Sequence, residues 1–339
     1  MRPFTYARPE SAAAAVQAFM AAGAGARYIA GGTSLYDLMK LDIEKPQHLI
    51  DVTTIRGLDA IETNGEQLRF EALAPMSAVA TDKVVLRDYP ILAEALWKAA
   101  SQQLRNMATV GGNLLQRTRC LYFRNGAGGT SVGNTYPCNK REPGSGCAAI
   151  GGLDRGQAVL GQSSSCTAVS PGDWPVALVA LDAYVEVLGA GGSRAIPIAE
   201  LYRLPGSTPN LEFTLQPGEM ITAIVVPKTK AGRHSTYHKI RDRESYAFAI
   251  ASAAVALDMD GDTVTRARIG LGGVATKPWR ATAAEALLAD KPLTPATALA
   301  AGHAAFADAK AGQHNGFKIE LGARTVADAL TIAAARNRS

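Results

Sequence analysis

The sequence predicts an α+β protein with more than one domain, and three observations lead to this expectation. The N-terminal part alternates short apolar stretches with helical patterns in a βαβ-like order. The C-terminal part places three strand-like stretches before three alanine-rich helical stretches, as expected of an α+β domain. Between these parts lies a stretch rich in Gly, Ser, Asn and Pro that holds all four cysteines of the 339-residue chain.

A helix and a small parallel sheet are expected first. Ser11 follows Pro and Glu as at a helix start and Gly23 is typical of a helix end, so this Ala-rich stretch is expected to be a helix rather than a leader peptide. Strands are predicted at 27–30 and 48–52, with a helix near 36–40 between them. This order favours a parallel sheet, because parallel strands need a crossover connection.

The central and C-terminal elements follow from the same patterns. From Leu68 onward the sequence predicts strands and two helical stretches, one of them at 91–100, then a hairpin across 189–193 and a strand at 221–226. The C-terminal part should contain strands at 234–241, 246–259 and 264–270, the last two joined by an Asp-Gly-Asp turn, and helices at 281–288, 296–307 and 323–335.

Composition excludes two classes of partner. The net charge of +5 comes from 35 basic and 30 acidic residues that are spread along the chain. A nucleic-acid partner is not expected, because such proteins carry a clustered basic surface. No apolar run approaches the roughly 20 residues of a membrane-spanning helix. The hydrophobic content of 47% is sufficient for packed cores.

The cysteines and two glycine turns are the candidate functional features. None of the gaps between the cysteines gives a CxxC pair, so a four-thiolate metal site, two disulfides and unrelated thiols all remain open. The turns AGGTSL at 30–35 and TVGGNL at 109–114 contain paired glycines and hydroxyls that could approach the two phosphates of a dinucleotide. Two unrelated tight turns are the alternative.

Four motifs in order resemble the FAD subunits of molybdenum hydroxylases, a family that includes xanthine dehydrogenase, carbon monoxide dehydrogenase and aldehyde oxidoreductases. The motifs are AGGTSL at 30–35, ATVGGNL at 108–114, SPGDWPVAL at 170–178 and RDRESYAFA at 241–249. The resemblance covers essentially the whole chain. It implies a two-part FAD-binding domain of the vanillyl-alcohol-oxidase (PCMH) type over 1–228, with subdomains of about 1–57 and 58–228. A domain like the CO dehydrogenase flavoprotein C-terminal domain, a three-stranded sheet with helices, is implied over 229–339.

The resemblance also implies the FAD-binding residues. Asp173 would bind an adenosine or ribitol hydroxyl, Lys239 would lie near the isoalloxazine, and Gly32 and Gly111 are expected to approach the pyrophosphate too closely for a side chain. Trp174 and the proline after it depart from the family pattern and leave the local backbone open. The remaining residues of the implied site are Tyr28, Ile29, Ala30, Gly31, Thr33, Ser34, Leu35, Thr109, Gly112, Asn113 and Leu114.

The cysteine-rich insert at 117–166 looks like that of the bacterial heterotrimeric aldehyde oxidoreductases. The segments CLYFR at 120–124 and CNKREPGSGC at 138–147 carry this resemblance. It implies one [4Fe-4S] cluster, either a structural staple, which we favour, or an electron relay. Its ligands would be Cys120, Cys138, Cys147 and Cys166.

The implied function is electron transfer within a molybdenum-containing aldehyde oxidoreductase, with no catalytic side chain in this chain. FAD would receive electrons from a [2Fe-2S] subunit, a molybdenum-cofactor subunit would oxidise the substrate, and an external acceptor would take the electrons from this heterotrimer. The compartment would be the cytoplasm, or the periplasm by co-export with a partner that carries a twin-arginine signal. A stand-alone FAD oxidase and a zinc-stapled binding module are the alternatives; the five histidines form no catalytic motif.

Overall fold

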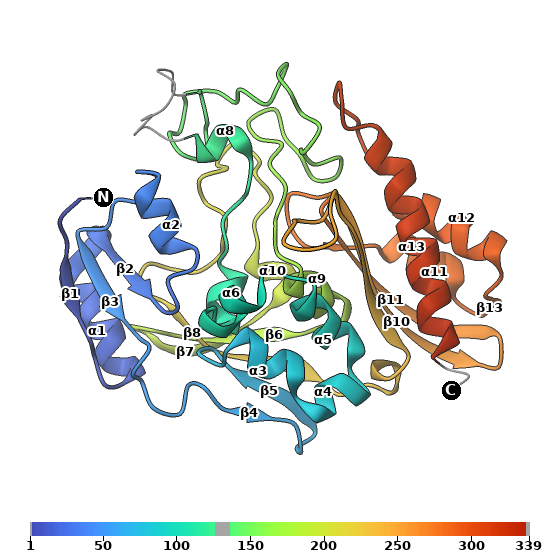
Figure 1. The fold of residues 1–339 in the computed structure, drawn as a ribbon, viewed down its shortest axis with the longest axis horizontal. Helices are drawn as coiled ribbons and strands as arrows, with labels where there is room; N and C mark the ends of the chain where they lie inside the picture. Colours follow the sequence, from blue (N-terminus) through green and yellow to red (C-terminus); the bar gives the residue numbers. More distant parts are fainter. Residues whose placement is uncertain (1, 126–135, 337–339) are drawn as a thin grey trace.

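The computed structural model describes residues 2–125 and 136–336 and arranges them around three sheets (Figure 1). The first sheet is parallel, with the order β1-β3-β2, and confirms the predicted βαβ opening. Ser11 caps the first helix by accepting a hydrogen bond from the backbone N–H of Ala14 at 3.2 Å. The elements are β1 (Thr5–Ala7), α1 (Ala12–Ala22), the 3-10 turn η1 (Gly23–Gly25), β2 (Ala26–Ile29), α2 (Leu35–Lys40) and β3 (His48–Asp51). Sequence patterns missed β1 because its three residues are all exposed.

The second sheet is antiparallel and has the order β4-β5-β8-β6-β7. Its strands are β4 (Ile61–Glu62), β5 (Gln67–Glu71), β6 (Tyr184–Gly189), β7 (Gly192–Pro197) and β8 (Met220–Pro227). The predicted hairpin is confirmed, since Gly189 pairs with Gly192. In the fully buried pair of Phe70 and Trp174 the edge of one ring meets the face of the other at 5.7 Å between centroids, which places Trp174 inside the core.

Helices cover this second sheet, and their number differs from the prediction. Four short helices, instead of two helical stretches, lie between β5 and the second glycine turn, because Pro75, Asp82, Pro90 and Ser101 each start a new helix. They are α3 (Met76–Thr81), α4 (Lys83–Asp88), α5 (Pro90–Trp97) and α6 (Gln102–Met107), followed later by α7 (Val110–Leu114), α9 (Trp174–Ala180) and α10 (Ile198–Leu201). Every residue of α9 is buried.

The third sheet forms the C-terminal part and has the order β12-β11-β10-β9, with β13 paired to β11. The three predicted long strands are present, although β10 begins at Ala251 and not near 246, and two short strands extend the predicted three-stranded sheet to five. The elements are η2 (Lys230–Gly232), β9 (Ser235–Ile240), β10 (Ala251–Asp260), β11 (Thr263–Gly272), β12 (Trp279–Arg280), α11 (Thr282–Leu288), β13 (Lys291–Pro292), α12 (Pro295–Ala305) and α13 (Phe317–Ala335).

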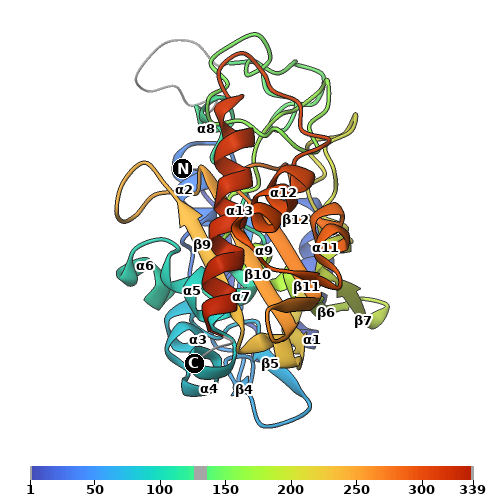
Figure 2. The ribbon, with the colours of Figure 1, turned by 90° about the vertical axis from the view of Figure 1, so that its right-hand side faces the viewer.

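The long strand β10 is covered on both faces. Ala253, Val255 and Leu257 belong to the core shared with the C-terminal helices, whereas Ala254 and Ala256 belong to the core of the second sheet. This alternation follows from the two-residue period of a strand. Figure 2 shows α13 lying across one face of this sheet. Burial on both faces explains why β10 reads as a continuous apolar run.

The cysteine-rich segment forms a lobe of loops next to α2, at the top of Figure 1. Within its described residues, 117–125 and 136–166, the one helix is α8 (Leu121–Arg124). Residues 126–135 of the predicted insert lie outside the described part of the chain. Among the helices of the described residues, none has the length and apolarity needed to cross a bilayer.

Candidate functional site

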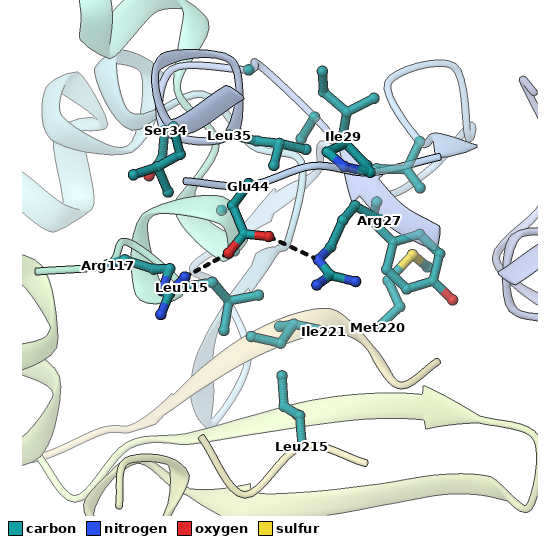
Figure 3. A pocket seen from close by; sticks show the side chains of 18 of the residues that line it. Arg27, Ile29, Ser34, Leu35, Glu44, Leu115, Arg117, Leu215, Met220 and Ile221 are labelled. Carbon is teal, nitrogen blue, oxygen red and sulfur yellow. Dashed lines mark hydrogen bonds and ion pairs between the residues drawn. The ribbon is translucent and has the colours of Figure 1, made fainter. Parts of the chain in front are cut away.

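A cavity of about 700 Å³ opens between the first sheet, α7 and the chain before β8 (Figure 3). Both glycine turns form its walls, together with apolar side chains such as Leu215, Met220 and Ile221. Of the predicted FAD-binding residues, the ones that line this cavity are Tyr28, Ile29, Ala30, Gly31, Gly32, Thr33, Ser34, Leu35, Thr109, Gly111 and Gly112. The structure therefore brings the two turns together, as the sequence predicted.

Glycine at 31 lets the first turn touch the end of α6, directly before the second turn. A Cβ atom on Gly31 would lie 1.7 Å from the backbone oxygen of Met107, so no side chain fits between the first turn and the end of α6. Gly32 has a different reason to be glycine. Its φ of +71° is in the left-handed region, while the nearest atom to a Cβ there, Ile29 Cδ1, is 3.7 Å away.

The second turn is organised by hydrogen bonds to Thr109 and Ala72. The hydroxyl of Thr109 accepts from the N–H of Gly112 at 3.2 Å, and the N–H of Gly111 donates to the Ala72 oxygen at 2.8 Å. A Cβ on Gly111 would lie 2.7 Å from the Ala72 Cβ. Packing against Ala72 is therefore one reason why position 111 holds glycine, and the close approach of the pyrophosphate stays a prediction.

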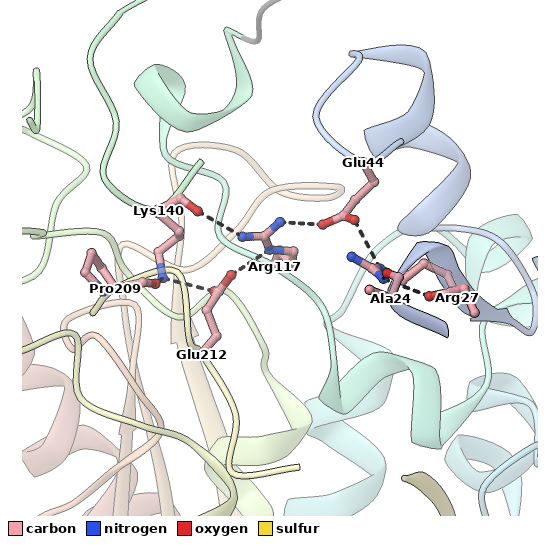
Figure 4. Close-up of polar contacts among 8 residues, drawn as sticks. Ala24, Arg27, Glu44, Arg117, Lys140, Pro209 and Glu212 are labelled. Atoms are coloured by element: carbon pink, nitrogen blue, oxygen red, sulfur yellow. Dashed lines mark hydrogen bonds and ion pairs between the residues drawn. The ribbon is translucent and has the colours of Figure 1, made fainter. Parts of the chain in front are cut away.

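Charged side chains line one end of the cavity in a continuous network (Figure 4). Arg117 is bound between two carboxylates, at 2.5 Å from Glu44 and 2.6 Å from Glu212. Glu44 also pairs with Arg27 at 3.3 Å, and Glu212 with Lys140 at 3.1 Å. Burial acts to lower the pKa of Arg117, but the two carboxylates outweigh this effect and raise it.

This network joins three parts of the chain that are distant in sequence. Arg27 and Glu44 belong to the first sheet region, Arg117 and Lys140 to the cysteine-rich segment, and Glu212 to the chain between β7 and β8. Sequence reasoning missed all five residues. They are single charges in loops or at a strand, where no periodicity or motif distinguishes them from solvent-exposed residues.

Four predicted FAD-binding residues are not among those that line the cavity: Asn113, Leu114, Asp173 and Lys239. Leu114 is in the core, and its carbonyl oxygen accepts from the Tyr202 hydroxyl at 2.9 Å. The Asn113 Oδ1 is buried and has no partner among the described residues.

Asp173 and Lys239 bind each other in the interior. The Lys239 ammonium lies 2.9 Å from one carboxylate oxygen of Asp173, and the Tyr237 hydroxyl donates to the other at 2.6 Å. Burial raises the pKa of Asp173, and the charge of Lys239 opposes this rise. The side chain of Lys239 is 1% exposed. This buried ion pair ties β9 to the start of α9, and the expected place of Lys239 near the flavin ring stays a prediction.

The four cysteines, all unpaired, line one small cavity. Backbone pairing places Cys138 opposite Cys147, and Cys166 opposite Ser163. Within the described residues, no three His, Cys, Asp or Glu side chains converge closely enough to hold a single metal ion. A four-iron cluster makes a different demand, because each thiolate binds a separate corner of the cluster.

Two N–H groups donate to cysteine sulfurs. The Gln157 amide donates to the Cys120 sulfur at 3.4 Å, and the Ala168 N–H to the Cys166 sulfur at 3.5 Å. Burial raises the pKa of Cys166 to about 11, so that cysteine carries its proton at neutral pH without a metal. Lys140 lines both this cavity and the larger one.

Comparisons with known proteins cover both parts of the chain. Residues 2–229 match the family model described as FAD binding domain in molybdopterin dehydrogenase, and residues 235–331 match the CO dehydrogenase flavoprotein C-terminal domain. The aldehyde oxidoreductase FAD-binding subunit PaoB of Escherichia coli is 46% identical, with 99% of this chain and 100% of that protein aligned. The carbon monoxide dehydrogenase medium chain of Afipia carboxidovorans is 30% identical over 88% of this chain and 85% of that protein.

Solved structures of carbon monoxide dehydrogenases are similar to nearly the whole chain. Carbon monoxide dehydrogenase from Hydrogenophaga pseudoflava aligns with a TM-score of 0.76 and 27% identity, over 99% of this chain and 98% of that one. The reconstituted CO dehydrogenase from Oligotropha carboxidovorans aligns with a TM-score of 0.76 and 26% identity, over 99% and 100% of the two chains.

The buried ion pair leads to a prediction about stability. Replacing Asp173 with Asn leaves the Lys239 ammonium buried without a counter-charge, which should lower the free energy of unfolding by about 3–5 kcal/mol. Adding Lys239→Met to Asp173→Asn removes that charge and should restore part of the loss. Urea unfolding followed by circular dichroism measures both effects. Equal stability of Asp173→Asn and the wild type would contradict the role of the pair.

The contact between the turns leads to a prediction about FAD. Gly31→Ala forces the first turn away from Met107, and overpacking of this kind costs roughly 1–3 kcal/mol. Because both turns line the cavity, FAD should bind roughly tenfold more weakly or worse. Quenching of flavin fluorescence measures the dissociation constant. Gly65→Ala is the control, since the nearest atom to its Cβ is 3.9 Å away. Wild-type affinity in Gly31→Ala would show that the turn contact does not shape the site.

Proposed function

Since the chain belongs to the family of FAD-binding subunits of molybdenum hydroxylases, we propose that it is the electron-transfer subunit of a molybdenum-containing aldehyde oxidoreductase and carries FAD and one [4Fe-4S] cluster. The observation that carries this proposal is the cavity formed by both glycine turns, since these are the family motifs expected to hold the FAD pyrophosphate. The similarity to PaoB along the whole chain supports aldehydes as the substrate class of the complex.

The chain's own residues would bind and enclose FAD. The first turn offers the hydroxyls of Thr33 and Ser34 at the cavity wall, and backbone groups of both glycine turns come close to it. The apolar wall suits an aromatic ring system. FAD, when bound, accepts single electrons and releases them in pairs, which one-electron centres cannot do alone.

The cysteine cavity supports the cluster proposal. The four cysteines of this segment line one space, with N–H donors directed at two of the sulfurs. Two disulfides would require sulfur pairing, and all four cysteines are unpaired. The insert has few large apolar residues of its own, so a cluster would supply binding energy that orders it.

The proposed partners are a [2Fe-2S] subunit that supplies electrons, a molybdenum-cofactor subunit that oxidises the substrate, and an external electron acceptor. A stand-alone FAD oxidase is less well supported. Such an enzyme needs an acid or base at the flavin. The described residues that line the cavity include no histidine, and the carboxylates Glu44, Glu212 and Glu219 are held in ion pairs with arginine or lysine side chains.

Reconstitution tests the proposed division of labour. The purified chain with FAD should not oxidise aromatic aldehydes, and activity with an artificial electron acceptor should appear only after both partner subunits are added. Acceptor reduction is followed by absorbance. Omission of either partner is the control. Aldehyde turnover by this chain alone, free of copurified proteins, would favour the stand-alone oxidase.

Metal analysis of Cys138→Ser tests the cluster. The wild type should contain four irons and four sulfides per chain, and Cys138→Ser should lose them, because a serine oxygen is a poorer ligand for iron in a cluster. Limited proteolysis should then cut within 117–166 faster. Ser164→Ala, at an exposed residue of the same segment, should keep the iron. Zinc in place of iron in the wild type would support the zinc-stapled module.

A further inference from the structure

The C-terminal domain holds the last part of the cysteine-rich segment by hydrogen bonds. The loop before α13 lies beside this segment (Figure 2), and the Asp154 carboxylate accepts from the backbone N–H groups of Gln313 and His314, both at 2.8 Å. The Lys310 N–H donates to the Val159 oxygen at 2.8 Å. The backbone before Cys166 is therefore fixed by residues of another domain.

Two buried side chains of the C-terminal domain meet at the backbone of Gln157. Lys318 is 2% exposed, and its ammonium donates to the backbone oxygens of Gln157 at 3.1 Å, Gly156 at 3.3 Å and Gly273 at 2.9 Å. Asn315, also 2% exposed, donates to the Gln157 oxygen at 3.4 Å. A buried ammonium that is held by three carbonyl oxygens fixes their positions tightly.

The side chain of Gln157 extends from this anchored backbone to the cysteines. It is 5% exposed and lines the cysteine cavity, where its Nε2 donates to the Cys120 sulfur at 3.4 Å. Its Oε1 has no partner among the described residues, so the bond to sulfur is the polar contact that orients this amide there. No other side-chain amide of the described residues donates to a cysteine sulfur among the hydrogen bonds of the structure.

We infer that Gln157 is a positioning residue at the cysteine site and that, through its bond to Cys120, it sets the reduction potential of the cluster. Lys318 and Asn315 act by holding Gln157 in place. This inference rests on the proposed [4Fe-4S] cluster. An N–H group that donates to a ligand sulfur stabilises the reduced, more negatively charged cluster and so raises its reduction potential. The C-terminal domain would then tune a centre to which it contributes no ligand.

The test uses the full chain loaded with iron and sulfide and measures the cluster's midpoint potential by a redox titration followed by electron paramagnetic resonance. Gln157→Met keeps the length of the side chain and removes the donor. The ratio of reduced to oxidised cluster at a fixed potential should fall about tenfold, which corresponds to about 59 mV for a one-electron couple. Lys318→Met should shift the midpoint potential in the same direction, by a smaller amount. Lys318→Arg keeps a charged donor and should show the wild-type midpoint potential.

Gln162→Met is the matched control. The Gln162 amide donates to the Lys310 oxygen at 2.7 Å and its side chain is not among those that line the cysteine cavity, so the potential should not move. An unchanged potential in Gln157→Met with four irons retained would overturn this inference and leave the cluster proposal intact. Absence of iron from the wild type would overturn both. Because Gln157→Met leaves the Lys318 contacts in place, it separates loss of the donor from loss of folding.

Discussion

The close approach of the two glycine turns is the constraint on which the candidate site depends. With no side chain at position 31, the first sheet region can rest its turn directly on the backbone of Met107. One wall of the cavity then comes from residues near 30, which follow β2 of the first sheet, and the other from residues near 110, which belong to α7. The charged network around Arg117 closes one end of the same space and attaches the cysteine-rich segment to it. Dinucleotide and cysteine sites thus share a boundary, at which Lys140 faces both.

Much of this arrangement could be predicted from the sequence. Elements with clear periodicity, such as α1, β11 and α12, lie close to where the patterns place them, because burial of one or both faces dictates their composition. In contrast, α13 begins at Phe317 and β10 at Ala251, away from the predicted starts at 323 and 246. The glycine turns could be predicted because paired glycines and hydroxyls next to a helix form a signal that is local in the sequence. The convergence of the cysteines followed from their restriction to one segment and from the family resemblance.

The rest of the site could not be predicted because it depends on long-range contacts. Nothing near Glu44 in the sequence indicates that it pairs with Arg117, and a buried arginine looks like an exposed one until its partners are known. The same holds for Asp173 and Lys239, since nothing near either residue in the sequence indicates that the fold pairs them with each other. The reason for a glycine could also not be read from the sequence. At Gly111 the neighbour that excludes a side chain is Ala72, a residue of the protein itself.

The packing of α9 against the third sheet has a consequence for how separable the domains are. Gly270 of β11 lies so close to α9 that a Cβ there would be 2.3 Å from the Val176 backbone oxygen, and Ala254 and Ala256 of β10 face the same neighbouring core. A fragment cut near residue 229 would expose this flat, apolar sheet face to water. Family models divide the chain there, but the packing of β10 and β11 against α9 joins the two parts. Recombination between relatives at this boundary would therefore have to exchange α9 and the sheet face together.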